Sequence, residues 1–167
     1  PYLELGWNDP PFTRTGGGYT PHFTLRAAYA AMISRLDREV GGILDELDTL
    51  GVADNTLVIF TSDNGATHLN DEVDVDFFAS VGELRGLKGS LYEGGIRVPA
   101  IVRWPGHVAA GSESPFISGF EDWLPTILEA AGCGANIPAE VDGLSLVSQI
   151  SEDNAPGLPG YQRPFLY

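Results

Sequence analysis

The chain has 167 residues, 43% of them hydrophobic, so it is long enough to bury an ordinary core within one domain. Nine basic residues oppose 23 acidic ones, which gives a formal net charge of −14. This charge argues against binding nucleic acid or an anionic membrane surface, because both need a basic face. The charge does not exclude binding of a small anionic ligand, because a bound cation and a nearby lysine can reverse the electric field inside one pocket.

The single cysteine, Cys133, excludes an internal disulfide and has no second thiol for a zinc or redox pair. We expect it to be a small buried or loop thiol. No apolar run is long enough to span a bilayer, and no signal peptide is visible. Because the chain begins at Pro1 and not at Met, we expect it to be a piece of a longer protein.

Residues 1–24 are rich in Pro, Gly and Thr and are predicted to form a loop or connecting segment. They contain His22, which we interpret as a surface or helix-start histidine, with contact to a substrate as the alternative. A helix is predicted from Leu25 to Leu50, with Gly51 ending it, because apolar residues recur there at steps of three and four. Its charged residues are expected to form a solvated face of a helix that covers a sheet.

A strand is predicted from Thr56 to Phe60, and its continuous apolar character favours a parallel strand buried on both faces. A helix that leads into such a strand indicates an α/β fold, with part of a mostly parallel sheet flanked by helices. Residues 66–83 are predicted to be an acidic, solvated loop. This loop carries His68, for which contact with a substrate and a loop-stabilising role are both open.

Two polar residues, Asp63 and Asn64, come just after this strand. Ligands of open α/β sheets gather outside the carboxyl ends of the strands. A carboxylate beside an amide carbonyl offers two hard oxygen donors, which suit Ca²⁺ or Mg²⁺. Further along, Lys88 lies between Gly86 and Gly89, which let a ligand approach the backbone closely. A divalent cation next to a fixed ammonium would hold a tetrahedral oxyanion.

The remaining segments continue the alternation of strands and helices. A second strand is predicted over residues 99–104, and a helix begins at Asp122, which we interpret as its N-cap and not as a catalytic acid. A short helix is expected over residues 144–150. Residues 151–167 are predicted to be a connector and the start of a following strand.

Five stretches of the chain together resemble a known family: FTSDNG at 60–65, LRGLKGSLYEGGIRVP at 84–99, IVRWPG at 101–106, EDWLPTIL at 121–128 and DGLSL at 142–146. They are similar to sulfatases of the arylsulfatase type, in the alkaline-phosphatase superfamily. The stretch around Lys88 is the most specific of them. The resemblance implies an alkaline-phosphatase-like fold, with residues 25–150 as the C-terminal portion of a catalytic domain.

The resemblance also implies roles for individual residues. Asp63 and Asn64 match the second pair of metal ligands of the family, Lys88 matches a lysine that contacts the sulfate, and Arg97 matches a position that we interpret as structural. Glu93 is expected to tie down the glycine-rich loop and not to act as a general acid. His68 follows the metal ligands, where many sulfatases also carry a histidine.

The resemblance implies hydrolysis of a sulfate ester with a formylglycine nucleophile, made from Cys or Ser in a Cys/Ser-x-Pro-x-Arg motif. This motif is absent from the sequence, as is the first pair of metal-binding aspartates, so both are expected in a missing N-terminal portion and the isolated chain is expected to be inactive. Alternatives are a phosphate or phosphonate monoesterase or a phosphoethanolamine transferase of the same superfamily, or a truncated non-catalytic relative. The family suggests a periplasmic, secreted or lysosomal location.

Overall fold

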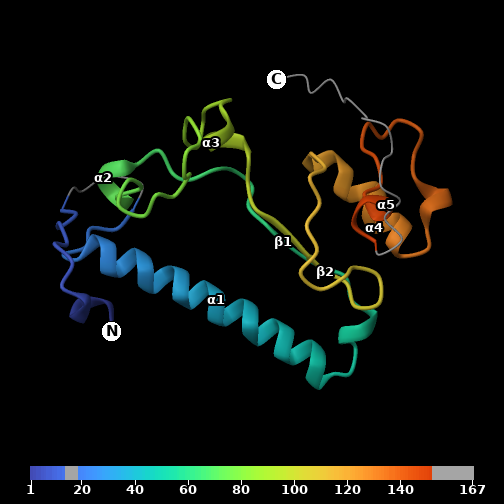
Figure 1. Cartoon of the computed structure of the whole chain (residues 1–167), viewed down its shortest axis with the longest axis horizontal. Coiled ribbons are helices and arrows are strands. Elements are labelled where there is room, and N and C mark those ends of the chain that lie inside the picture. The colour runs from blue at the N-terminus through green and yellow to red at the C-terminus, as the bar shows by residue number, and fades with distance from the viewer. Residues whose placement is uncertain (14–18, 152–167) are drawn as a thin grey trace. The chain divides into compact units, whose positions relative to one another are not determined.

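The computed structural model describes residues 1–13 and 19–151. Its helices and strands, in chain order, are α1 Leu25–Thr49, β1 Val58–Thr61, α2 Asn70–Val73, α3 Glu93–Ile96, β2 Ala100–Arg103, α4 Trp123–Ala130 and α5 Val147–Ile150 (Figure 1). Short 3₁₀ turns are η1 Tyr2–Leu5, η2 Ala53–Asn55, η3 Phe120–Asp122 and η4 Gly134–Asn136. The strand expected at 163–167 lies outside the described residues.

The two strands form one two-stranded sheet, β1–β2. Both strands are found where the sequence predicts them, with ends that differ by one or two residues. Their burial is less than expected, since Phe60 is 37% and Ile101 is 60% exposed. The prediction that the first strand is buried on both faces is therefore wrong for the described chain, and the wider, mostly parallel sheet stays a prediction.

The chain divides into two compact units. The first combines Pro1–Leu50 with Phe60–Ala100, and in it α1 packs against η1 and α2. The second combines Gly51–Ile59 with the chain from Ile101 onward, and in it α4 packs against η3, η4 and α5. No helix within residues 1–13 and 19–151 has the length and apolar character that crossing a bilayer requires.

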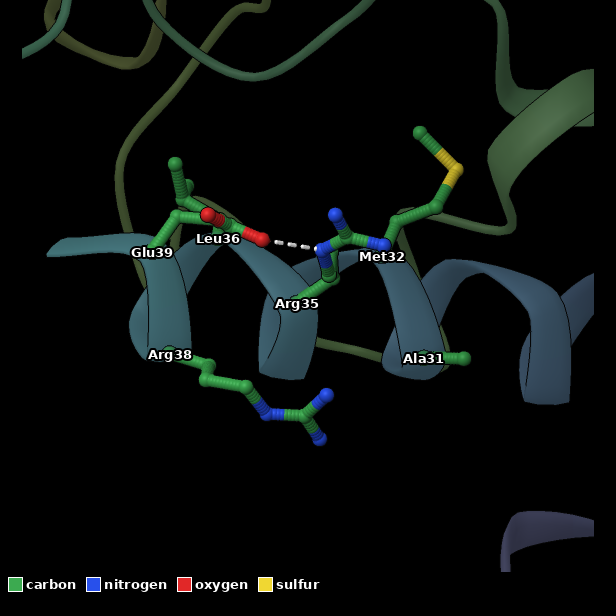
Figure 2. Close-up of a pocket in the computed structure, with 6 residues that line it drawn as sticks. All are labelled: Ala31, Met32, Arg35, Leu36, Arg38 and Glu39. Atoms are coloured by element: carbon green, nitrogen blue, oxygen red, sulfur yellow. Dashed lines mark hydrogen bonds and ion pairs between the residues drawn. The ribbon is translucent and has the colours of Figure 1, made fainter. Parts of the chain in front are cut away.

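The long helix α1 confirms the predicted helix almost residue for residue, and Gly51 follows it with φ of 69°. A hollow of about 610 Å³ lies along this helix, and all six side chains that line it come from α1 itself (Figure 2). Arg35 and Glu39, one helical turn apart, form an exposed ion pair there. The hollow is therefore a feature of a solvated helix surface and contains none of the candidate site residues.

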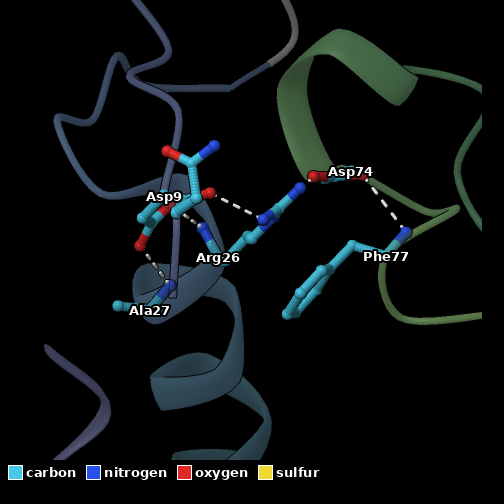
Figure 3. Close-up of polar contacts among 6 residues, drawn as sticks. Asp9, Arg26, Ala27, Asp74 and Phe77 are labelled. Carbon is cyan, nitrogen blue, oxygen red and sulfur yellow. Dashed lines mark hydrogen bonds and ion pairs between the residues drawn. The ribbon is translucent and has the colours of Figure 1, made fainter. Parts of the chain in front are cut away.

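The N-terminus of α1 is fixed by residues distant in sequence (Figure 3). The Asp9 carboxylate accepts hydrogen bonds from the backbone N–H groups of Arg26 at 2.7 Å and Ala27 at 2.9 Å. It thereby satisfies two donors that have no partner inside the helix. Arg26 in turn forms a 2.7 Å ion pair with Asp74, and its guanidinium lies 4.0 Å from the centre of the Phe77 ring.

Two predicted loops contain short ordered elements. Within residues 1–24 the structure has η1 and a β-bridge between Phe12 and His22, and Phe12 is only 4% exposed. The 66–83 loop contains α2, and in it Glu72 is 3% exposed and accepts a 2.9 Å hydrogen bond from the Tyr19 N–H. The expectation that its acids are solvated is therefore wrong for Glu72, because this carboxylate fixes the preceding segment.

Candidate functional site

The turn that follows β1 is held by its own hydroxyl groups. Thr61 Oγ1 donates to the carbonyl of Pro99 at 2.9 Å, and Ser62 Oγ donates to the carbonyl of Asn64 at 2.8 Å. These bonds fix the backbone on both sides of Asp63. The Asp63 side chain is exposed and has no hydrogen-bond or ion-pair partner within residues 1–13 and 19–151. Its carboxylate is therefore available to a ligand.

Backbone contacts bring the turn and the Lys88 loop together. The Lys88 N–H donates to the carbonyl of Ala66 at 2.7 Å, and the Gly65 N–H donates to the carbonyl of Gly95 at 2.9 Å. A Cβ atom at Gly65 would overlap the carbonyl of Gly94, and one at Gly94 would overlap the carbonyl of Gly86. Only glycine fits these two positions, because the chain segments touch backbone to backbone.

Lys88 lies at the tip of the loop between two glycines with positive φ, 87° at Gly86 and 88° at Gly89. Residues with a side chain rarely adopt this conformation, which explains the glycines. The lysine is exposed, and its ammonium has no carboxylate partner in the described part of the chain. An uncompensated cation thus lies on a loop whose backbone is fixed against the turn that carries Asp63 and Asn64.

Glu93 is the first residue of α3 and Arg97 directly follows its last; this helical turn was not among the predicted elements. Arg97 N donates to the carbonyl of Glu93 at 2.8 Å, and the side chains form an ion pair at 3.3 Å. Both side chains are largely exposed, so the pair adds at most about 1 kcal/mol. The pair is local to α3, so the role of Glu93 in holding the glycine-rich loop stays a prediction.

Asn64 and Arg97 also face a cavity of about 420 Å³ within the first unit. Its other walls come from α1 and from three further segments of the chain: Tyr29, Ile33, Ser62, Gly65, Ala66, Ser80, Val81, Leu84, Gly94, Val98 and Pro99. Asp63, Lys88 and His68 do not line this cavity. The structure therefore joins the Lys88 loop to the turn through the backbone, and places only Asn64 of the proposed ligands at the cavity.

The donor set suits a hard cation in chemistry but supplies only part of a coordination sphere. Asn64 is half-buried and its Nδ2 donates to the carbonyl of Gly65 at 3.1 Å, which leaves the amide oxygen free to accept or ligate. Calcium takes six to eight oxygen ligands. No group of three or more His, Cys, Asp or Glu side chains suited to a metal is found among the described residues. Further ligands would have to come from elsewhere.

The three histidines and Cys133 do not line this cavity, and two of the histidines have structural partners. His68 is exposed and has no partner within residues 1–13 and 19–151. His22 Nδ1 accepts a hydrogen bond from the Thr24 N–H at 3.1 Å, and His107 stacks on Trp104 with 4.0 Å between ring centres. Cys133 is an exposed loop thiol.

Asp122 occupies the predicted N-cap position of α4, but its side chain acts elsewhere. Its carboxylate makes no capping bond to α4. It accepts hydrogen bonds from the Gly119 N–H at 2.9 Å and the Leu144 N–H at 2.8 Å, and the residue is 1% exposed. The sequence analysis missed the Leu144 contact, because nothing local to Asp122 indicates a partner so far along the chain.

Comparison with known proteins places the chain in a family. The family model described as Sulfatase matches residues 7–133. N-acetylgalactosamine-6-sulfatase of Rattus norvegicus is 39% identical over 124 residues, which cover 74% of this chain and 23% of the relative. Arylsulfatase A of Homo sapiens is 38% identical over 122 residues, which cover 72% of this chain and 23% of the relative. The chain thus spans about a quarter of the length of these relatives.

Solved structures show the same relationship. The PsFucS1 sulfatase from Pseudoalteromonas sp. matches with a TM-score of 0.61 and 31% identity, covering 72% of this chain and 23% of that one. A protein solved in complex with its substrate D-glucosamine-2-N,6-O-disulfate matches with a TM-score of 0.63 and 28% identity. The match covers 80% of this chain and 24% of that one. These likenesses support an α/β sulfatase fold. On the matched region and these identities, the chain belongs to the sulfatase family.

Proposed function

We propose that this chain supplies part of the sulfate-binding site of a sulfuric ester hydrolase. Asp63 and Asn64 are the proposed ligands of Ca²⁺ or Mg²⁺, and Lys88 is the proposed sulfate contact. The observation that carries the proposal is the 2.7 Å hydrogen bond from Lys88 N to the Ala66 carbonyl, beside the backbone packing of Gly65 on Gly94. It holds an unpaired ammonium on a fixed loop beside the turn that carries the two oxygen donors.

The chemistry of sulfate ester hydrolysis gives each group a task. A bound divalent cation would neutralise negative charge on the sulfate oxygens. The exposed Asp63 carboxylate and the Asn64 amide oxygen would be the residues of this chain that hold it. Lys88 places a compact positive charge against a sulfate oxygen on which charge develops in the transition state. His68, exposed and without a partner among the described residues, is a second candidate for contact with the substrate.

The nucleophile of the proposed reaction is not supplied by this chain. The Cys/Ser-x-Pro-x-Arg motif is absent from the sequence, and the exposed Cys133 is followed by Gly134 and Ala135. We therefore propose that a formylglycine and the remaining metal ligands come from another part of the complete natural polypeptide. That part is the partner that the proposed reaction needs.

The substrate class that we propose is a sulfate ester. Relatives of nearly equal identity carry different names, N-acetylgalactosamine-6-sulfatase at 39% and steryl-sulfatase at 38%. Sequence identity therefore does not select one ester among them.

Paired calcium titrations of activity test the roles of Asp63 and Lys88. The complete natural polypeptide is assayed with an aryl sulfate, as wild type and as Asp63→Ala, Lys88→Ala and Arg38→Ala. We expect Asp63→Ala to weaken metal affinity, so that excess Ca²⁺ restores part of the activity. Lys88→Ala should lower kcat by about a hundredfold or more, as loss of one preorganised electrostatic donor does, with no response to added Ca²⁺.

Arg38→Ala is the matched control, because it removes an exposed cation on α1 that has no carboxylate partner within the described residues. It should leave turnover unchanged. Near wild-type turnover by Lys88→Ala would show that Lys88 is a solvated loop residue and that the proposed site is wrong. Turnover of an aryl phosphate in preference to the sulfate would point to a monoesterase of the same superfamily.

A further inference from the structure

Positive charge is concentrated around the Lys88 loop, although the chain as a whole carries −14. Residues 85–97 contain Arg85, Lys88 and Arg97, with Glu93 as the single acid of that span. Glu93 pairs with Arg97 at 3.3 Å. Arg85 and Lys88 are left as two uncompensated cations on one short loop. A local positive patch in an acidic protein raises the concentration of anions at that place.

Arg85 is held in position through both its backbone and its side chain. Its carbonyl accepts a hydrogen bond from the Gly94 N–H at 2.7 Å, which joins it to the same backbone packing that fixes the Lys88 loop. Its guanidinium carbon lies 3.8 Å from the centre of the Tyr92 ring. Both side chains are exposed, so the guanidinium edge stays accessible while its face rests on the ring.

Three of the other arginines are paired with carboxylates, whereas Arg85 on the Lys88 loop and Arg38 on α1 have no such partner within the described residues. Arg26, Arg35 and Arg97 each have a carboxylate partner, at Asp74, Glu39 and Glu93. Arg85 has none within residues 1–13 and 19–151, although the chain is rich in acids. A guanidinium with fixed orientation and free N–H groups is a bidentate partner for a carboxylate or sulfate.

We propose that Arg85, held on Tyr92, is a second anion-binding point that selects sulfate esters with a further anionic group. The inference rests on the proposed function, in which Lys88 contacts the sulfate that is removed. Three residues span roughly 10 Å at most between Cα atoms, so Arg85 and Lys88 can reach two anionic groups of one small molecule. The shared chemistry of the second group is a planar or tetrahedral oxyanion, either carboxylate or sulfate.

A purely structural role for the stacked pair makes a different prediction. A cation–π contact at an exposed site contributes about 0.5–1 kcal/mol. If Arg85 only stabilised the loop, its loss would disturb Lys88 and would affect every sulfate ester equally. Selective loss on esters with two anionic groups separates binding of the second anion from support of the loop.

The test measures kcat and KM of the complete natural polypeptide with three aryl sulfates: one with no further charge, one with a ring carboxylate and one with a second sulfate. Arg85→Gln should raise KM for the two dianionic esters by about ten- to a hundredfold, as expected for one charge-assisted contact. It should change kcat/KM for the singly charged ester by less than about threefold, the scale of surface substitutions. Arg85→Lys should keep part of the preference, and Arg38→Gln should leave all three esters unchanged.

Comparison of the two dianionic esters shows which anion the site prefers. Equal losses of Arg85→Gln on all three esters, or no loss on any of them, would overturn the proposal. A binding titration with benzene-1,3-disulfonate and benzenesulfonate separates this result from failure of the proposed function. Suppose that the wild type hydrolyses no ester but binds the disulfonate more tightly than benzenesulfonate, and that Arg85→Gln abolishes this difference. The proposed reaction then fails, whereas the second anion-binding point is confirmed. Equal binding of both sulfonates overturns it.

Discussion

At the residue scale, the candidate site depends on glycines that allow backbone segments to touch. Gly65 packs on the carbonyl of Gly94, and Gly94 packs on the carbonyl of Gly86. Gly95 packs in the same way on the carbonyls of Ser90 and Leu87. These contacts set the position of Lys88, because its own N–H donates to Ala66 next to Gly65. A single methyl group would therefore displace the loop that carries the proposed sulfate contact.

Substitution of Gly94 by alanine tests this packing. The added methyl overlaps a carbonyl and cannot be relieved by rotation of a side chain, so we expect the free energy of unfolding to fall by about 1–3 kcal/mol. Activity of the complete polypeptide should fall further than stability alone explains, because Lys88 moves. Denaturant titration and assay of kcat measure the two effects.

Gly42→Ala is the matched control, since a Cβ atom at Gly42 meets no other atom within 4 Å. Gly42 lies in the interior of α1, where alanine is favoured by about 1 kcal/mol. The control should keep or raise stability and leave activity unchanged. A Gly94→Ala variant with unaltered stability and turnover would contradict the close packing.

At the element scale, a buried polar pair joins the start of α4 to the segment that precedes α5. Thr126 is fully buried; its Oγ1 donates to the Asp122 carbonyl at 2.6 Å and accepts from the Leu146 N–H at 2.8 Å. Asp122 accepts from the Leu144 N–H at 2.8 Å. Gly143 lies where any Cβ atom would overlap the Glu121 carbonyl. This one interface therefore explains why these residues occur in the two stretches 121–128 and 142–146.

Asp122→Ala should destabilise this interface strongly. It leaves the part-buried N–H groups of Gly119 and Leu144 without their acceptor, and we expect the two losses together to cost about 1–3 kcal/mol. Thr126→Val keeps the volume but removes both hydroxyl contacts, and should cost about 1–3 kcal/mol. Thermal unfolding of each variant, with amide exchange at Leu144 and Leu146, measures the effect.

The exposed Glu140 offers a control, because Glu140→Ala should change stability by no more than about 0.5 kcal/mol. If the Leu144 amide still exchanges slowly in Asp122→Ala, other contacts hold this segment and the prediction is wrong.

At the scale of the whole molecule, several large apolar side chains remain exposed on α1. Met32 is 64%, Leu36 is 50% and Ile43 is 60% exposed, on a helix whose pattern is that of an element covering a sheet. Exposed apolar faces of this kind mark surfaces that bind other protein segments. The chain spans about 23% of the length of the N-acetylgalactosamine-6-sulfatase that it matches, which agrees with the proposal that it works within a longer polypeptide.

We predict that the isolated 167-residue chain binds a fluorescent apolar dye and hydrolyses no aryl sulfate, with or without Ca²⁺. The residual catalysis left without a nucleophile is small. The complete polypeptide should bind less dye per chain and unfold in a sharper transition. Turnover by the isolated chain that is abolished by Lys88→Ala would show that the chain is sufficient for the reaction, against this prediction.

The sequence by itself determined the features that depend on local pattern. The three-and-four spacing of apolar residues placed α1, continuous apolar runs placed β1 and β2, and Asp122 marked the start of α4. Five stretches together, of which the one around Lys88 is the most specific, indicated the sulfatase family, which the family model confirms. Each of these signals is carried by neighbouring residues, so it can be read without knowledge of the fold.

Only the tertiary structure decided which distant residues serve one another. The capping of α1 by Asp9, the acceptor role of Asp122 toward Leu144 and the pairing of Arg26 with Asp74 join segments far apart in the chain. No local pattern encodes such partners, because a carboxylate in a loop has the same sequence signature whether it binds a backbone N–H or faces water. The physical reason is that hydrogen-bond partners of buried polar groups are fixed by packing, and packing is a property of the folded chain.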